Sequence, residues 1–168
     1  MTDLVLGRLV CAMTDYYAGD AKRIQHFIKV RGFAATIGRL EGLDKEELFV
    51  LETAALVHDI GIKVCERKYG SCNGKLQELE GPAEAEKLLV SLGDFSTETI
   101  ERVCWLVAHH HTYNDIADID YQILVEADFL VNVFEDGILP DAISQFKKNV
   151  FKTKTGIYLL ERMYANSD

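Results

Sequence analysis

The chain has 168 residues, of which 48% are hydrophobic and 27% are charged, as in an ordinary globular protein. At this length we expect a single domain over residues 1–168, large enough to bury most of its apolar surface. The net charge of −9 argues against general nucleic-acid binding and against an anionic membrane surface as a partner.

The first part of the chain predicts three helices, and capping residues mark where two of them begin. The first helix is expected over residues 4–17. Asp20 can cap the second, because its carboxylate can accept hydrogen bonds from the free amides of the next turn. Asp44 and Glu47 have the pattern of a capping box at the start of the third.

The second part of the chain begins with a polar segment. Residues 63–80 are rich in Lys, Gly, Ser and Asn, and we expect them to form an irregular loop that covers a site. Pro82 suits the first turn of a helix over residues 82–92, and Ser96 can cap the next helix. Further helices are expected over residues 121–135, 141–150 and 156–164. No segment shows sustained alternation, so the predicted fold class is all-α, a helical bundle.

Histidines and carboxylates fall on the buried faces or the ends of these helices. Helical spacing places His26 on an apolar face and His58 at a buried helix end, while Asp128 lies in an apolar segment. Asp59 follows His58, and at a helix end both side chains can reach one ion. A lone buried histidine usually pairs with the backbone, but a buried unpaired carboxylate is strongly disfavoured. The four residues therefore indicate a metal site between helices, with nitrogen and oxygen ligands that suit Mn, Fe, Co, Ni or Zn.

The order His … His-Asp … Asp resembles the motif of the HD superfamily. The matching segments are Arg-Ile-Gln-His26, Ala-Leu-Val-His58-Asp59-Ile-Gly, Leu-Val-Ala-His109-His110-His111 and Glu-Ala-Asp128. They define a motif-bearing core over residues 20–135. The resemblance implies an HD-type helical domain and a metal-dependent hydrolase, most often of phosphate esters in nucleotides. A minority of the superfamily are di-iron oxygenases.

The resemblance also bears on a second ion. Family members with two metals add histidines between the His-Asp pair and the last Asp, and Glu80 stands where one of these is expected. Glutamate can bind Fe, Mn or Zn, but it can equally be an acid favoured by a helix N-terminus. Helical spacing turns His110 inward, whereas the resemblance favours the pair His109 and His110. We expect His111 to be exposed to solvent or to lie behind the ligands. Alternatively, the three rings bind phosphate without touching a metal. One ion is expected, and a second is allowed.

Two basic residues are candidates for binding a phosphate. Arg23 lies one turn before His26, and Lys63 follows the His-Asp pair by four residues. Arginine offers bidentate geometry to a phosphate, while Lys63 can equally be a solvent-facing charge. We expect Asp59, or another carboxylate near the ion, to accept a proton from the attacking water, and Arg23 and Lys63 to stabilise charge on the phosphate.

The sequence thus predicts a metal-dependent phosphohydrolase that acts on a small phosphorylated substrate, a nucleotide or another metabolite. Two alternatives are an HD-type di-iron oxygenase and a non-catalytic nucleotide or metal sensor. No run of about 18 uncharged apolar residues is present, and the start of the chain lacks the pattern of a signal peptide. We therefore expect a cytoplasmic protein that binds no membrane. The four cysteines include no Cys-x-x-Cys pair and indicate no disulfide framework.

Overall fold

The computed structural model describes residues 2–164, and this part of the chain folds into helices without a strand. The helices are α1 (Thr2–Tyr16), α2 (Ala21–Leu40), α3 (Lys45–Val57), α4 (Gly61–Tyr69), α5 (Gly74–Leu92), α6 (Thr97–Val107), α7 (Ile119–Glu135), α8 (Pro140–Val150) and α9 (Lys154–Met163). The predicted all-α class is confirmed. None of the helices in this part of the chain is both long and apolar enough to cross a membrane.

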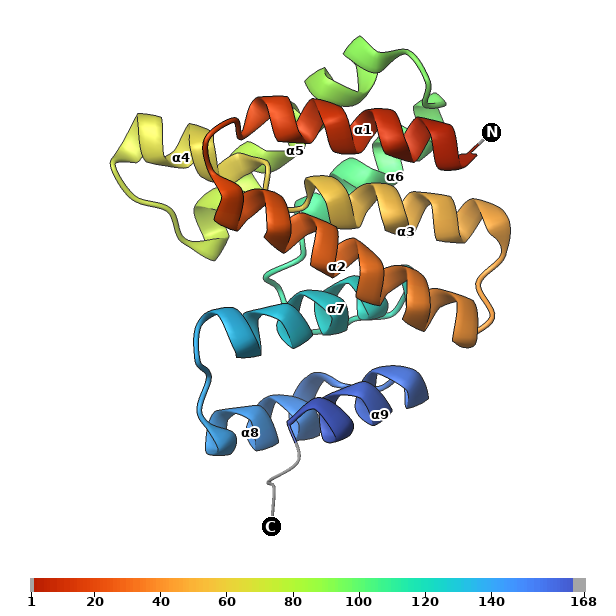
Figure 1. The fold of residues 1–168 in the computed structure, drawn as a ribbon, viewed down its shortest axis with the longest axis vertical. Coiled ribbons are helices and arrows are strands. Elements are labelled where there is room, and N and C mark those ends of the chain that lie inside the picture. Colours follow the sequence, from red (N-terminus) through yellow and green to blue (C-terminus); the bar gives the residue numbers. More distant parts are fainter. Residues whose placement is uncertain (1, 165–168) are drawn as a thin grey trace.

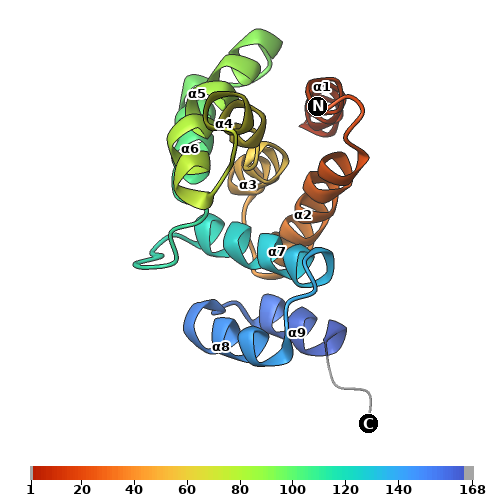
Figure 2. The same ribbon diagram turned by 90° about the vertical axis from the view of Figure 1, so that its left-hand side faces the viewer.

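Helix α7 lies at the centre of the bundle. In Figures 1 and 2 it runs between α2 and α3 on one side and α8 and α9 on the other, while α4, α5 and α6 stand beside α3. A surrounded helix needs apolar residues on every face, and most of α7 is buried. Glu126 and Asp128 are buried with it, so each carboxylate must find partners inside the molecule.

The capping residues start the helices where the sequence predicts. Asp20 and Ser96 each accept a hydrogen bond from the backbone amide three residues later. Asp44 and Glu47 form the reciprocal bonds of a capping box at the start of α3. These local signals place α2, α3 and α6, which bring histidines to the site described below.

The segment 63–80 does not form the irregular cover that its composition suggested. Helices α4 and α5 take up most of it, and only residues 70–73 connect them. Gly70 ends α4 in the left-handed conformation, with φ of 69°, and Asn73 starts α5 by accepting from a backbone amide at 3.0 Å. Pro82 lies inside α5 rather than in its first turn. Many polar residues of the segment lie on the solvent side of two helices, which explains why composition alone indicated a loop.

Two glycines let α4 and α5 cross at close range. A Cβ atom on Gly61 would lie 2.9 Å from the backbone nitrogen of Gly81 and 3.0 Å from the carbonyl oxygen of Gln77. A Cβ atom on Gly81 would lie 2.7 Å from the side chain of Val107. Any larger side chain would push α5 away from its neighbours. The crossing therefore sets the rotation of α5, and with it the direction in which Gln77 points.

Hydrogen bonds to Glu126 hold the segment between α8 and α9 against α7. Its carboxylate accepts from the backbone amides of Lys152 and Thr153 at 2.7 and 3.0 Å, and from the Thr153 hydroxyl. Gly156 leaves room for it, since a Cβ atom there would lie 2.0 Å from a Glu126 oxygen. The buried charge is thus satisfied by the two residues that precede α9.

Candidate metal centre

Three buried histidines each direct Nδ1 away from the site and Nε2 into it. His58 and His110 donate from Nδ1 to the backbone carbonyl three residues earlier, at 2.9 and 2.8 Å. His26 donates from Nδ1 to Oε2 of Glu135 at 2.8 Å. Carbonyl and carboxylate oxygens only accept hydrogen bonds, so each Nδ1 carries a hydrogen. The inward group of each neutral ring is therefore the lone pair of Nε2, as in a histidine that binds metal.

The first group of ligand atoms comes from α2, the end of α3 and α7. The Nε2 atoms of His26 and His58 lie 3.3 Å apart. Nε2 of His26 lies 3.4 Å from Oδ2 of Asp59 and 3.2 Å from Oδ1 of Asp128. Nε2 of His58 lies 3.5 Å from each of the same two oxygens. The four residues that the sequence predicted as ligands are therefore brought together.

Asp59 joins this group to a second one. Its Oδ2 faces His26 and His58, while its Oδ1 lies 3.4 Å from Nε2 of His110. The ligand atoms of Asp59, His110 and His111 lie within 4.8 Å of one another. A carboxylate placed between two sets of nitrogen ligands can hold one ion with each oxygen.

The electrostatic field of the site favours positive charge. Complete burial opposes the charged form of His58, yet Asp59 and Asp128 outweigh it and raise the pKa of this ring to about 9. Burial also opposes the charged form of His26, and the same two carboxylates raise its pKa above the usual value. Burial would raise the pKa of both aspartates, but the histidines hold each pKa well below its usual range. Both carboxylates are therefore ionised at neutral pH.

The donor set fits a divalent transition metal. Ligand bonds of about 2.0–2.2 Å place neighbouring ligand atoms roughly 3–3.5 Å apart, close to the spacing of the first group. Nε2 of His110 and Oδ1 of Asp128 are buried without a hydrogen-bond partner among residues 2–164. Buried polar atoms are rarely left in this condition, and a cation in each ligand group would satisfy them. Imidazole nitrogens with carboxylate oxygens suit Mn, Fe, Co, Ni or Zn.

Of the three consecutive histidines, His110 and His111 face the site and His109 does not. The ring of His109 stacks on Trp105 at 4.1 Å and donates from Nδ1 to the carbonyl oxygen of the same residue. His111, expected to be exposed or behind the ligands, lines the pocket instead, with Nε2 buried. Its ring packs on Gly74, where a Cβ atom would lie 2.8 Å from it. Burial and the neighbouring His110 lower the pKa of His111 to about 4, so the ring is neutral.

Glu80 also lies outside the site. It accepts hydrogen bonds from Lys68 at 2.5 Å and from Tyr69 at 2.7 Å, on the exposed side of α4 and α5. The residue of α5 that lines the pocket is Gln77, one turn earlier. Neighbouring helical residues diverge by about 100°, so Glu80 turns away once Gly81 packs against α4.

The two predicted basic residues have different positions. Arg23 lines the pocket, but its guanidinium binds Glu66 through two hydrogen bonds of 3.1 and 2.5 Å and lies 3.3 Å from Asp20. Lys63 points away from the pocket and donates to the carbonyl oxygen of Tyr16 at 2.6 Å. The expectation that Lys63 contacts a phosphate is therefore not supported, because its amine is held against α1.

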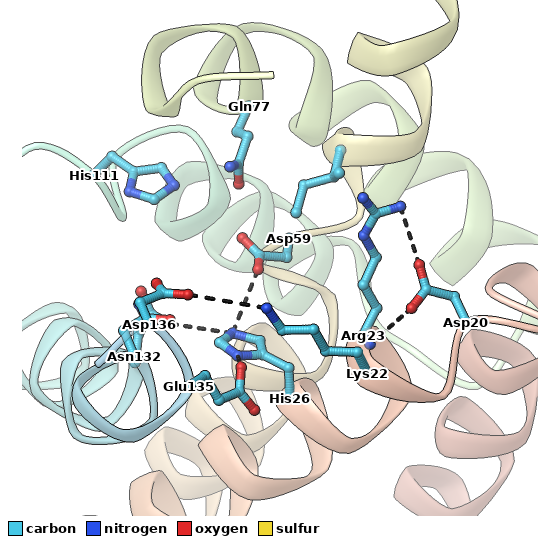
Figure 3. Close-up of a pocket in the computed structure, with 12 residues that line it drawn as sticks. Asp20, Lys22, Arg23, His26, Asp59, Gln77, His111, Asn132, Glu135 and Asp136 are labelled. Carbon is cyan, nitrogen blue, oxygen red and sulfur yellow. Dashed lines mark hydrogen bonds and ion pairs between the residues drawn. The ribbon is translucent and has the colours of Figure 1, made fainter. Parts of the chain in front are cut away.

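A cavity of about 350 Å³ opens onto the cluster. Figure 3 shows Asp59 near its centre, with Gln77 on one side and His26 on the other. The residues that line the cavity are Asp20, Lys22, Arg23, His26, Asp59, Ile62, Gln77, His111, Asp128, Asn132, Glu135 and Asp136. The metal ligands are thus reachable from solvent by a small molecule.

Three residues of the site were missed by the sequence reasoning. Asn132 and Glu135 follow Asp128 by four and seven positions, so the three share one face of α7. This polar stripe on an otherwise apolar helix is a signal that the sequence does contain. Gln77 carries no such signal, because its direction depends on how α5 crosses α4.

Comparisons with known proteins agree with this geometry. The family model of the HD domain matches residues 23–133, which include the ligand residues of both groups. Among solved structures, the chain is similar to a predicted HD superfamily hydrolase from an uncultured Thermotogales bacterium, with 25% identity and a TM-score of 0.66. That similarity covers 94% of this chain and 84% of the other. A comparison with curated proteins found no match. The chain belongs to the HD domain family of metal-dependent hydrolases.

Proposed function

We propose that this protein is a metal-dependent phosphohydrolase that cleaves a phosphate ester of a small metabolite. The observation that carries the proposal is the convergence of histidine Nε2 atoms with Asp59 and Asp128 at the wall of an open pocket. Lys22 and Arg23 line the same pocket and supply positive charge near its mouth. Nitrogen and oxygen ligands beside basic groups suit an anionic, oxygen-rich substrate.

Residues of the pocket would have three roles in this reaction: binding the metal ion, orienting the attacking water and balancing the charge of the phosphate. His26, His58, Asp59 and Asp128 would hold a divalent ion, which would supply Lewis acidity toward a phosphoryl oxygen. Asp59 stays ionised, so its carboxylate can orient the attacking water by accepting its hydrogen. Arg23 keeps donors beyond those it gives to Glu66, and with Lys22 it would balance charge on the phosphate.

The test measures phosphate-ester hydrolysis by protein from which a chelator has removed metal and to which Mn²⁺, Fe²⁺, Co²⁺, Ni²⁺ or Zn²⁺ has then been added. We expect release of p-nitrophenol from p-nitrophenyl phosphate with at least one of these ions, and none from the stripped protein. The variant Asp128→Asn should lose both metal and activity, whereas Asp141→Asn, an exposed carboxylate on α8, should keep both.

Three outcomes would contradict the proposal. The first is phosphate release that survives in the stripped protein or in Asp128→Asn. The second is oxygen consumption by the iron-loaded protein without any phosphate release, which would favour an oxygenase. The third is binding of phosphorylated compounds with no turnover under any metal, which would favour a sensor.

A further inference from the structure

Almost all the residues that line the pocket are polar or charged. Among the lining residues, all within 2–164, Ile62 is the one aliphatic side chain, and no Phe, Tyr or Trp contributes. Ligand pockets are usually lined by apolar and aromatic groups, and nucleobases in particular are held by stacking on them. The rings of His26 and His111 belong to the two ligand groups, and the guanidinium of Arg23 is paired with Glu66, so this wall leaves a nucleobase little free flat surface. It offers amide, carboxylate and imidazole groups instead, which make hydrogen bonds.

Gln77 presents an unsatisfied acceptor to this pocket. Its Oε1 is buried and has no hydrogen-bond partner among residues 2–164. Its backbone is held in place by the close crossing with Gly61, and its side chain points toward the cavity in Figure 3. A buried acceptor without a donor is costly, so a ligand that brings a donor gains affinity there. An amide both accepts and donates, which matches a hydroxyl group or a pair of neighbouring hydroxyls.

A second amide, on the far side of the cavity, extends this polar surface. Asn132 lines the pocket from α7, whereas Gln77 lines it from α5. A molecule seated between them would meet an amide on each side and the metal ligand Asp59 near the centre. The cavity of about 350 Å³ is near the lower end of the roughly 300–1,000 Å³ range of ligand sites. The molecule that fits is therefore small and carries hydroxyl groups.

The charges of the lining favour one phosphate group over two or three. Lys22 and Arg23 are the two basic residues of the described lining, while five carboxylates share it, Asp136 and Glu135 among them. One phosphate can be balanced by a divalent ion at the metal ligands together with the two basic side chains. Each further phosphate would face carboxylates and be repelled by them.

We propose that the substrate is the phosphate monoester of a small polyhydroxylated alcohol, such as a polyol or sugar phosphate, and that Gln77 recognises its hydroxyl groups. The inference rests on the proposed phosphohydrolase function and specifies its substrate class. Nucleoside mono-, di- and triphosphates are then poor substrates.

The first experiment compares kcat/KM of the metal-loaded wild-type protein across a set of phosphates. The set contains p-nitrophenyl phosphate, glycerol 3-phosphate, ribose 5-phosphate, glucose 6-phosphate and the nucleoside 5′-mono- and triphosphates. We expect at least one polyol or sugar phosphate to exceed every nucleotide by about tenfold or more, the scale of one well-placed hydrogen bond. Hydrolysis of p-nitrophenyl phosphate with nucleotides preferred would overturn this inference alone. No hydrolysis of any compound would overturn the proposed function, and this inference with it.

The second experiment tests Gln77 through a ratio of specificities. Gln77→Met keeps the length of the side chain and removes its amide. We expect the ratio of kcat/KM for the preferred hydroxylated substrate over p-nitrophenyl phosphate to fall roughly tenfold, with bound metal unchanged by elemental analysis. Gln145→Met on the exposed face of α8 is the matched control and should leave the ratio unaltered. An unchanged ratio in Gln77→Met, or loss of metal from it, would show that Gln77 does not select substrate.

Discussion

The Nε2 atoms of His26 and His58 lie 3.3 Å apart, although each ring has already given its Nδ1 hydrogen to an oxygen acceptor. Two neutral rings in this state would face each other with lone pairs, which repel. A positive charge between the two rings removes this repulsion. The neighbouring carboxylates of Asp59 and Asp128 attract such a charge. The geometry is therefore arranged for a cation, and the charge can be a proton or a metal ion.

Competition between a proton and a metal ion predicts the pH dependence of metal binding. The carboxylates raise the pKa of His58 to about 9 despite its burial, so this ring is protonated at neutral pH after chelation. Since a ligand histidine must be neutral, metal binding should release at least one proton per ion at pH 7.5. Apparent affinity should rise with pH, by up to about tenfold per pH unit, until the pH passes about 9.

Calorimetry in two buffers of different ionisation enthalpy measures the protons released. His111, with a pKa of about 4, is already neutral and should add none.

The folding stability of the metal-free protein should change with pH in the opposite direction to metal affinity. Stabilisation by protonated His58 is complete below its unfolded pKa near 6.5, and is lost as the pH rises through about 9. Its Tm should therefore fall over this range. Metal binding without proton release would contradict the assignment of His58 as a ligand.

Glu135 is expected to control metal affinity without touching the metal. Its carboxylate accepts the Nδ1 hydrogen of His26 at 2.8 Å and also pairs with Lys29. In Glu135→Leu the ring loses its orienting partner, and we expect metal affinity to fall by roughly 10–100-fold. Glu135→Gln keeps an acceptor for the Nδ1 hydrogen, so its metal affinity should lie between that of Glu135→Leu and that of the wild type. Glu161→Leu, which removes another carboxylate paired with a lysine, serves as the control. Equal affinities in all of these proteins would exclude a positioning role.

The second ligand group predicts which histidine affects the metal count. His110 turns Nε2 toward Oδ1 of Asp59, whereas His109 stacks on Trp105. If a second ion binds, His110→Ala should lower the metal content by about one ion per chain, and His109→Ala should leave it unchanged. Elemental analysis of both variants measures this directly. Loss of metal from His109→Ala with none from His110→Ala would reverse the assignment.

Gly61 is predicted to be essential for the packing of α5. Gly61→Ala places a Cβ atom 2.9 Å from backbone atoms of Gly81, which cannot move independently of the helix. We expect a loss of about 1–3 kcal/mol in the free energy of unfolding, measured by chemical denaturation. Gly32→Ala is the matched control, because Gly32 lies exposed in α2 with nothing within 4 Å of a Cβ atom. That change should stabilise the protein by roughly 0.5–1 kcal/mol. Similar effects of both substitutions would mean that the crossing is not close.

Features that depend on short stretches of sequence could be predicted before the structure. The caps at Asp20, Asp44 and Ser96 act within one helical turn, so the sequence alone places the starts of α2, α3 and α6. Helical spacing likewise places His26 and His58 on buried faces. The polar segment 63–80 was misread because composition does not distinguish the solvent side of a helix from a loop.

What the sequence determined by itself is an all-α chain whose His26, His58, Asp59 and Asp128 meet inside it, since apolar faces must pack together and carry these residues with them. The tertiary structure alone decided the remaining wall of the site. The choice of Gln77 over Glu80 depends on the rotation of α5, and that rotation is set by contact with Gly61 on another helix. In the same way, Gly74 of α5 leaves space for His111 to turn inward. The contact of His109 with Trp105, by contrast, spans only four residues and is local. The positions of Gln77 and His111 arise from steric contacts between segments far apart in the chain, and no local pattern encodes them.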